Sequence, residues 1–342
     1  MHETLPRIQD SFPWGEDLWL KASAGPFLPE SWENELRQGP WYRLFLPRAL
    51  GGAQCSLPQG LEVLIQAAAH QGSLGWRVNL GAGAGFFAGC MAPETARQVY
   101  SAPGSVVAGS GAAKGRARWD GKNWRLSGTW QHCTGALQAT AFTFNAITDE
   151  GQIRTFILQP DQVQILKHWP YFGLKSSHTY TVQTPEEAVV EPHMIFDIGK
   201  AHQFWDYPLY RMDFMVFAKY CMAASLVGMA LCVCHHAHAW TAAGSKANPH
   251  FYQALRLLET AATHAREILN ADSEKLYKRL LHNSADSDHT FPSATIFKKI
   301  SEILQYSWQL FQSGGMDMCR EDVPVHQALR DMWLAGQHFL VK

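Results

Sequence analysis

A short stretch in the middle of the chain combines an indole, an imidazole and a hydroxyl at strand spacing. It runs from Trp124 to Gly135 and reads Trp-Arg-Leu-Ser-Gly-Thr-Trp-Gln-His-Cys-Thr-Gly. Alternate residues of a β-strand point to the same face, so we expect Trp130, His132 and Thr134 to share one. A threonine hydroxyl can donate or accept a hydrogen bond. The stretch therefore predicts a ligand-contacting face, with an ordinary strand-end threonine as the alternative.

A second residue able to do chemistry lies near the other end of the sequence. His338 follows the pair Arg330-Asp331, and we expect it within the last helix. Imidazole ordinarily titrates near pH 6.5, which suits proton transfer at neutral pH. His338 is therefore a candidate base, and a core or interface histidine is the alternative. Arg330 and Asp331 are expected to pair with each other and fix the helix.

Two further groups of residues invite a binding interpretation. Gly109, Ser110 and Gly111 are expected to form a compact loop whose free amides could approach a phosphate, although such loops are often plain turns. Cysteines and histidines also cluster between Cys232 and His238. That run has no second ligand group at fixed spacing, so it predicts a packed helix and no metal site.

Composition limits the classes of function. The net charge of the 342 residues is −1, which gives no basic excess for nucleic acid. Charged residues make up 17%, against about 25% in an average protein, and this favours subunit interfaces. The seven scattered cysteines and an N-terminus without an apolar stretch predict a cytoplasmic protein with reduced thiols. The apolar run from Phe214 to Cys234 is interrupted by Lys219 and predicts a buried central helix, with no membrane span.

Hydrophobic periodicity divides the chain into three parts. Helical spacing dominates to about residue 100 and returns after Pro208, whereas alternation with period two covers about 104 to 197. We therefore expect an N-terminal helical domain (1–103), a middle antiparallel, barrel-like β-domain (104–200) and a C-terminal helical bundle (201–342). This is an α+β multidomain protein.

The order of these parts and several motifs resemble the acyl-CoA dehydrogenase superfamily. The similar stretches, in chain order, are Leu46-Pro-Arg-Ala-Leu-Gly-Gly, Ser73-Leu-Gly-Trp76, the hairpin from Trp119 to Asn145, Trp169-Pro-Tyr-Phe-Gly-Leu-Lys-Ser-Ser-His, Pro192-His-Met-Ile-Phe196, Gly314-Gly315 and Leu329-Arg-Asp-Met-Trp-Leu-Ala-Gly-Gln-His338. Trp130 precedes Gly135 by five positions, and a histidine stands where many dehydrogenases have a catalytic glutamate. Both features resemble the two-component, flavin-dependent monooxygenase (group D) branch.

The resemblance implies a flavin, FMN or FAD and loosely held, with the Thr134 hydroxyl near its N5 atom. The residues implied to contact the flavin are Trp130, His132, Thr134, Gly135, Gly109, Ser110, Gly314 and Gly315. The implied substrate pocket is lined by Trp76, Phe86, Phe87 and Tyr171, with His338 as the catalytic base.

The resemblance implies an oxidoreductase that takes reduced flavin from a separate reductase and inserts oxygen from O2 into a small aromatic or heteroatom substrate. It also implies a homodimer or homotetramer. Two alternatives remain open: an acyl-CoA dehydrogenase using FAD, with Glu259, Glu267 or Glu302 as the base, and a flavin-free paralogue acting as a binding or assembly module.

Overall fold

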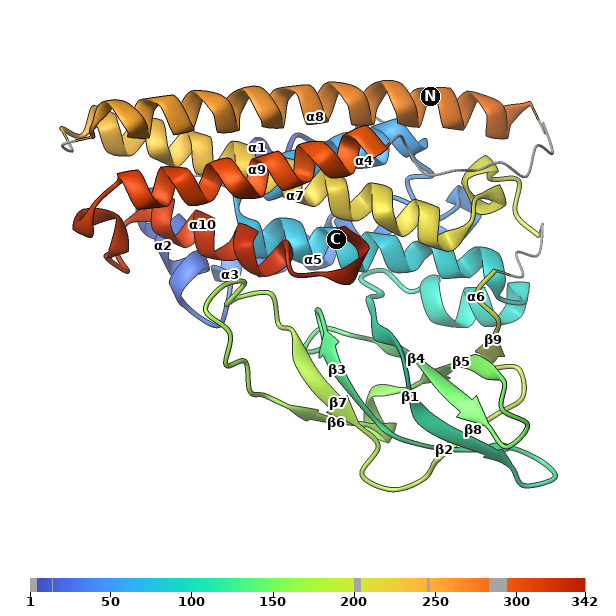
Figure 1. Ribbon diagram of the computed structural model, residues 1–342. Coiled ribbons are helices and arrows are strands. Elements are labelled where there is room, and N and C mark those ends of the chain that lie inside the picture. The colour runs from blue at the N-terminus through green and yellow to red at the C-terminus, as the bar shows by residue number, and fades with distance from the viewer. Residues whose placement is uncertain (1–4, 14, 200–203, 245–246, 283–293, 342) are drawn as a thin grey trace.

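A layer of long helices lies over a smaller β-domain (Figure 1). The computed structural model describes residues 5–13, 15–199, 204–244, 247–282 and 294–341. The longer helices are α2 (Glu16–Ala24), α3 (Glu30–Gln38), α4 (Leu57–His70), α5 (Gly72–Gly83), α6 (Pro93–Tyr100), α7 (Phe214–Ala242), α8 (Pro249–Leu281), α9 (Ala294–Ser313) and α10 (Pro324–Ala335). Short helical turns are α1 (Ile8–Ser11), η1 (Trp41–Arg43), η2 (Arg48–Leu50), η3 (Ala84–Cys90), η4 (Pro160–Gln162), η5 (Pro208–Arg211), η6 (Met316–Cys319) and η7 (Phe339–Val341).

Helix α7 is the centre of the helical layer, as its apolar sequence predicts. It packs against α4, α5, α8 and α10, so helices from both ends of the chain form one layer. It is the one helix among the described residues that is long and apolar enough to cross a membrane. Within its most apolar window, 83% of the residues are buried by the rest of the protein. That burial fits a core helix of an all-helical layer.

Local signals explain where helices α4 and α5 of this layer begin. The Ser56 side chain accepts a hydrogen bond from the Gln59 amide, and the Gln59 side chain accepts one from the Ser56 amide, which starts α4. Gln71 caps α5 in a similar way by accepting from the amide of Leu74. Because α5 begins one residue after this cap, Trp76 and Arg77 fall in its first two turns.

The β-domain is built from two sheets. The larger has the strand order β8-β2-β1-β4-β5-β9 and the smaller β3-β7-β6. The strands are β1 (Val107–Trp119), β2 (Trp124–Ser127), β3 (Thr129–Cys133), β4 (Ala141–Thr148), β5 (Ile153–Leu158), β6 (Gln164–Leu166), β7 (Tyr180–Gln183), β8 (Ala188–Val190) and β9 (Ile195–Phe196). The expectation of a wholly antiparallel domain is wrong in one pairing, because β1 and β4 run parallel. Parallel neighbours need a long crossover, and here β2 and β3 supply it.

The glycine-rich segment of residues 109–111 is also not a compact loop. It belongs to β1, where Gly109 lies opposite Thr143 and Ser110 opposite Phe144. The pairing shifts register between Ser110 and Gly115. A Cβ at Gly109 would lie 2.0 Å from the Thr143 carbonyl oxygen, so only glycine allows this approach of the two strands. The segment is therefore a strand with a bulge.

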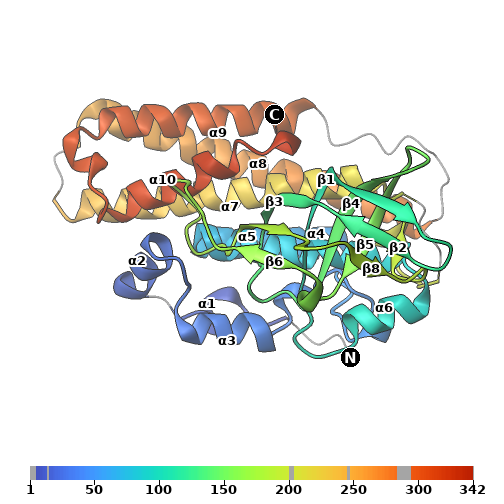
Figure 2. The same cartoon turned by 90° about the horizontal axis from the view of Figure 1, so that it is seen from below.

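The β-domain meets one face of the helical layer. In Figure 1 the upper end of β3 points toward α5, and the C-terminal end lies nearby. Seen from below, in Figure 2, the strands lie across α5 and α4, while α9 and α8 extend beyond them. Residues far apart in sequence therefore meet between the two layers.

Candidate active site

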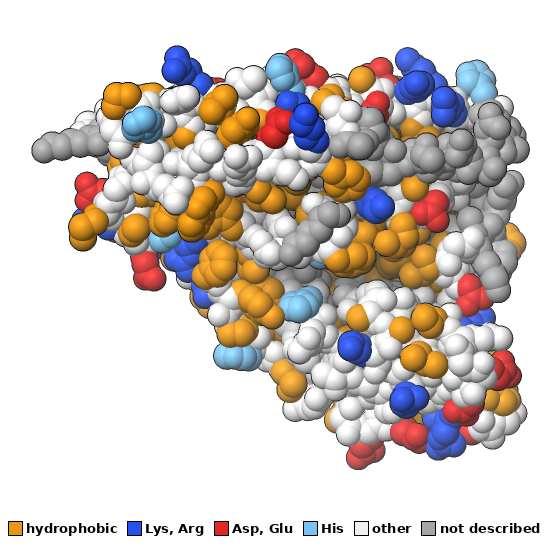
Figure 3. All heavy atoms as spheres, viewed as in Figure 1, with side chains coloured by type: hydrophobic (Ala, Val, Ile, Leu, Met, Phe, Trp, Pro, Cys, Tyr) orange, Lys and Arg blue, Asp and Glu red, His pale blue; other side chains and the backbone are white. Residues whose placement is uncertain are grey.

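A recess separates the helical layer from the β-domain on the side of α10 and the C-terminal turn. Figure 3 shows it edged by hydrophobic side chains. Trp76 from α5 lies next to Thr134, which follows β3, and next to His338, which follows α10. The Trp76 Nε1 atom lies 3.1 Å from Thr134 Oγ1, and the Trp76 and His338 rings are 6.0 Å apart. We call the region around these three residues the interlayer cleft, and His132 lies close enough to it to influence the pKa of His338.

Thr134 begins a chain of buried hydroxyl groups. Its Oγ1 lies 2.9 Å from Thr179 Oγ1, which lies 2.8 Å from Ser177 Oγ. Ser177 Oγ donates to the carbonyl oxygen of Leu174 at 2.7 Å. We call Trp76, Thr134, Thr179, Ser177 and the Leu174 carbonyl the hydroxyl chain. Thr134 is 8% exposed, Thr179 3% and Ser177 0%, so the chain is shielded from water.

Thr179 and Ser177 were not among the residues predicted from the sequence. Their only signal was the run of small polar residues from Ser176 to Thr179, inside the motif that begins at Trp169. They meet Thr134 because β3 pairs with β7, with Cys133 opposite Tyr180. That pairing places the entry to β7 beside the exit from β3.

The predicted common face of Trp130, His132 and Thr134 does not exist. The β3–β7 pairing shifts register between Trp130 and Cys133, and His132 has φ 62°. One extra residue in a strand reverses the faces that follow it. Trp130 is fully buried, stacks on Phe144 at 4.2 Å and donates from Nε1 to the Asn145 carbonyl. Its side chain therefore belongs to the core of the β-domain.

His132 instead lies toward the surface, at the edge of the cleft. Its Nε2 atom is 3.0 Å from the Tyr171 hydroxyl. Tyr171 packs on Trp169 with ring centres 4.4 Å apart. The contact between His132 and Tyr171 therefore ties β3 to the segment of residues 169–178, next to the cleft.

Helix α10 holds the segment 169–178 through Arg330 and Asp331. These two residues are not used as the predicted pair, because each bonds the backbone of this segment. Arg330 Nε donates to the Phe172 carbonyl at 2.7 Å, and Asp331 Oδ1 accepts from the Leu174 amide at 2.6 Å. A Cβ at Gly173 would lie 2.3 Å from the Arg330 carbonyl. The helix and the segment are therefore in close backbone contact.

Leu174 has φ 50° and His178 has φ 51°, a region that side chains other than glycine rarely adopt. Such conformations cost about 1–3 kcal/mol each and persist where surrounding structure enforces them. The Asp331 carboxylate provides that support at Leu174. Burial of Asp331 raises its pKa to about 7, although the amide of Leu174 opposes the shift. The segment beside the hydroxyl chain is thus held in a fixed, strained shape.

His338 lies in the turn between α10 and η7, outside the helix in which we expected it. Its ring faces Trp76 edge-on, at an interplanar angle of 68°. Burial and, to a smaller extent, the charge of His132 lower its pKa to about 4, so the imidazole is neutral at pH 7. Its Nδ1 accepts from the Leu340 amide at 3.4 Å, which assigns the ring proton to Nε2. Proton uptake at Nδ1 requires release of this long bond.

The other residues predicted to line the pocket are placed less favourably. Phe86 is 2% exposed and stacks on Phe217 at 4.8 Å. Phe87 is partly buried and lies 5.1 Å from Phe214 and 5.5 Å from Phe196. Phe86 is therefore a core residue, and Phe87 packs where η3 meets α7 and β9.

Gly135 shows that space exists beside Thr134. Its backbone is buried and has φ 74°. An ideal Cβ there would have no heavy atom within 4 Å, apart from its two chain neighbours. The covered backbone of Gly135 therefore borders open space next to Thr134.

Gly314 and Gly315 lie elsewhere, in the turn after α9. The Ser313 carbonyl beside them accepts from Asn248 at 2.8 Å, which places them near the start of α8. Within this chain they are not part of the interlayer cleft.

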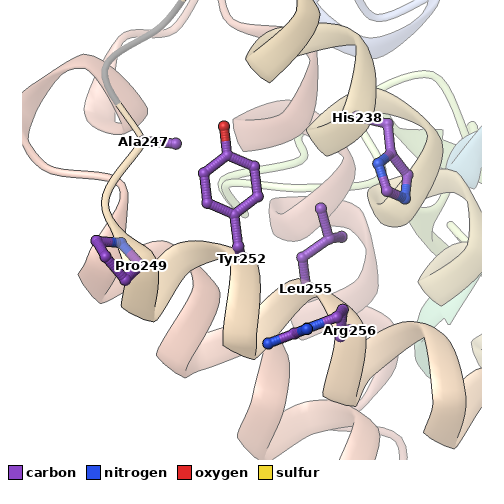
Figure 4. A pocket seen from close by; sticks show the side chains of 6 residues that line it. All are labelled: His238, Ala247, Pro249, Tyr252, Leu255 and Arg256. Atoms are coloured by element: carbon purple, nitrogen blue, oxygen red, sulfur yellow. The ribbon is translucent and has the colours of Figure 1, made fainter.

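A separate hollow of about 490 Å³ opens to solvent where α7 ends and α8 begins (Figure 4). It is lined by His238, Ala247, Pro249, Tyr252, Leu255 and Arg256. His238 bonds Glu259 there at 3.4 Å. None of the predicted flavin contacts lines this hollow, so it is distinct from the cleft.

A charged network lies directly behind the hydroxyl chain. Arg77, the neighbour of Trp76, donates from Nη1 and Nη2 to Glu33 at 2.6 and 2.9 Å. Glu33 Oε1 is 3.7 Å from the Nε2 atom of His178, the neighbour of Thr179. His178 Nδ1 is 2.7 Å from Gln138 Oε1. We call Glu33, Arg77, His178 and Gln138 the ionic network. Burial and Arg77 lower the pKa of His178 to about 4.

Comparison with known proteins gives the fold a context. No family model matches the sequence. A curated relative, the pigment production hydroxylase of Rhodococcus sp. (strain ATCC 21145), is 23% identical over 193 residues. The match spans 53% of this chain and about half, 50%, of the length of that protein.

Solved structures match over nearly the whole chain. The 3-HSA hydroxylase from Rhodococcus sp. RHA1 has a TM-score of 0.84 at 15% identity, covering 96% of this chain and 90% of that chain. XiaF from Streptomyces sp., in complex with FADH2 and glycerol, has a TM-score of 0.82 at 17% identity, covering 96% and 88%. These matches and the α-β-α order confirm the predicted architecture: the chain has the acyl-CoA dehydrogenase-like fold that is shared with these two proteins.

Proposed function

We propose that this protein is a flavin-dependent monooxygenase that takes reduced flavin from a separate reductase. The observation that carries the proposal is the meeting of Trp76, Thr134 and His338 in the interlayer cleft. These residues come from the helical, β and C-terminal parts of the chain, and the resemblance predicted all three. Similarity to a hydroxylase and to a structure holding FADH2 supports the same function.

Thr134 and Gly135 are the residues proposed to receive the flavin ring. Ser110 and Gly109, which lie partly buried on β1, are proposed as further contacts of the flavin. When bound, reduced flavin would supply the reactivity toward O2. The protein would orient the flavin ring and exclude water. The near-complete burial of the hydroxyl chain provides such exclusion on the β-domain side.

The substrate is proposed to be a small aromatic compound lying near Trp76, Tyr171 and His338. Aromatic rings prefer offset or edge-to-face contacts with other rings, and Trp76 and Tyr171 offer both kinds of surface. The neutral His338 imidazole can donate from Nε2 to a substrate oxygen, or accept a proton at Nδ1. His338 is therefore the proposed proton-transferring residue.

The structure favours this function over an acyl-CoA dehydrogenase. Glu259 and Glu267 lie on α8, which is on the side of the helical layer away from the β-domain (Figure 1). Glu302 on α9 is paired with Lys299 at 2.7 Å. None of these carboxylates is therefore placed to act as a base in the interlayer cleft.

We further propose that the protein is cytoplasmic and forms a homodimer or homotetramer. Exposed apolar side chains on the helical layer support assembly, among them Tyr252, Leu257 and Trp308. Sedimentation or light scattering of the purified protein measures the oligomeric state directly.

Incubation with a flavin reductase, NADH, ¹⁸O2 and a panel of phenols and heteroaromatic compounds tests the reaction. We expect a product that carries one ¹⁸O atom only when both flavin and reductase are present. Reduction of bound FAD by an acyl-CoA without oxygen insertion would instead establish the dehydrogenase.

A further inference from the structure

The proton positions in the hydroxyl chain follow from counting donors and acceptors. A carbonyl oxygen can only accept, so the Ser177 hydroxyl donates its single proton to the Leu174 carbonyl oxygen, at 2.7 Å. Thr179 must then be the donor in its 2.8 Å contact with Ser177. With that proton used, the 2.9 Å contact between Thr134 and Thr179 requires Thr134 to donate.

Thr134 is consequently left without a proton to offer. The Trp76 indole can only donate, so it occupies one of the two lone pairs of Thr134 Oγ1, at 3.1 Å. One lone pair remains. Whatever lies beside Thr134 in the cleft therefore meets an acceptor.

We propose that Thr179 and Ser177 are positioning residues that turn the Thr134 proton away from the cleft, so that the site selects reduced over oxidised flavin. This inference rests on the proposed function. Reduced flavin carries an N–H donor at N5, whereas oxidised flavin has only a lone pair there. A hydrogen-bond acceptor at Thr134 pairs with the N5–H of reduced flavin and repels the N5 lone pair of oxidised flavin.

The far end of the chain is fixed firmly enough to hold this direction. Leu174, whose carbonyl oxygen accepts from Ser177, also donates its backbone N–H to the Asp331 carboxyl group at 2.6 Å. Asp331 is 1% exposed, and its Oδ2 accepts from Gln71 at 3.4 Å. Asp331 on α10 and Gln71 at the start of α5 therefore hold Leu174 in place. The Leu174 carbonyl in turn fixes which hydroxyl donates in each hydrogen bond between Ser177 and Thr134.

Anaerobic calorimetry with oxidised and dithionite-reduced FMN and FAD tests the proposal through the ratio of their dissociation constants. We expect wild type to bind the reduced form more tightly. Thr134→Val removes the acceptor and is expected to weaken binding of the reduced form roughly five- to tenfold. Thr179→Val frees the Thr134 proton to point into the cleft, so it is expected to tighten binding of the oxidised form by a similar factor. Ser177→Ala is expected to act like Thr179→Val.

Thr95→Val is the matched control, because its buried hydroxyl makes one comparable bond, to the His193 carbonyl at 2.9 Å. It is expected to keep the wild-type ratio, and circular dichroism confirms folding of each variant. A wild-type ratio in both folded Thr179→Val and Ser177→Ala would overturn the proposal while leaving the flavin function intact. Failure of wild type to bind either redox form would contradict the proposed function and this inference with it.

Discussion

The ionic network and the hydroxyl chain are neighbours in sequence but differ in chemistry. Arg77 follows Trp76 on α5, and His178 precedes Thr179 at the entry to β7. Arg77 and His178 meet Glu33 behind the cleft, whereas Trp76 and Thr179 meet Thr134 beside it. The Arg77–Glu33 pair thus joins α5 to α3 and reaches the β-domain through His178, whereas the Thr134 hydroxyl lies beside the proposed ligand site.

The difference indicates which polar groups hold the fold and which are available for function. In the ionic network, the Arg77 guanidinium and the Glu33 carboxylate compensate each other's charge by a two-bond contact. In the hydroxyl chain, Thr134 retains one free lone pair. Changes in the first should therefore alter stability, and changes in the second should alter ligand preference.

Arg77→Ala tests the structural side with the largest expected effect. The Arg77 side chain is 0% exposed and Glu33 13%, so removing the guanidinium leaves a mostly buried carboxylate unpaired. Breaking such a pair costs about 3–5 kcal/mol, measured as the free energy of unfolding in urea. Arg118→Ala, at the exposed pair with Glu187, is the matched control and should leave stability unchanged. Equal changes in the free energy of unfolding for the two substitutions would contradict a structural role of the ionic network.

His338→Phe tests the functional side. Loss of a proton-transferring group lowers rates about 10²–10⁴-fold, and phenylalanine keeps the packing on Trp76. We expect product formation to fall by about 10² or more, while the unfolding free energy and the affinity for reduced flavin stay near wild type. A variant that retains full turnover would exclude His338 from the reaction.

Acidification should weaken the fold through buried histidines. Burial lowers the pKa of His178 to about 4 and that of His236 to about 3. These groups are neutral when folded but protonate near pH 6.5 when unfolded, so stability is lost as the pH falls from about 6.5 toward 4. Each pKa unit corresponds to about 1.4 kcal/mol, so the two histidines together are expected to lower the free energy of unfolding by several kcal/mol over this interval, measured in urea titrations.

Asp331 opposes this trend and provides a check. Because its pKa is raised to about 7, the folded state holds a proton that the unfolded state releases above about pH 4. Asp331 therefore raises the free energy of unfolding as the pH falls from about 7 to 4. Asp331→Asn should therefore steepen the loss of stability between about pH 7 and 4. A shallower loss in this variant would show that Asp331 is ionised throughout that range.

A double-mutant cycle on Trp76→Phe and Thr134→Val should give the smallest effect. The bond between an indole N–H and a hydroxyl contributes about 0.5–1.5 kcal/mol of coupling to the unfolding free energy. The same cycle on Arg77 and Glu33 should give a larger value. Similar couplings in both cycles would contradict the division between the two networks.

Much of the fold could be predicted from the sequence because periodicity reports burial. The apolar α7, the helices around Phe251 and the order of α, β and α segments follow from such patterns. The parallel pairing of β1 with β4 could not be predicted, because strand pairing between distant segments leaves no local signal.

The site was predicted in part for the same reason. Thr134 and His338 were predicted from their places in motifs that resemble the family, and both lie next to Trp76 in the structure. The bulge at His132 breaks the face that Trp130 was predicted to share with Thr134. Thr179 reaches Thr134 only through the pairing of β3 with β7. A one-residue register shift and a long-range pairing are set by tertiary packing, which sequence alternation does not report.

The most direct test of the account is a structure determined after anaerobic soaking with reduced flavin. We predict that the flavin ring lies in the interlayer cleft against Gly135, with N5 within hydrogen-bonding distance of Thr134 Oγ1. A ring bound at the hollow between α7 and α8, or a cleft that stays closed around Trp76 and His338 at saturating flavin, would contradict it.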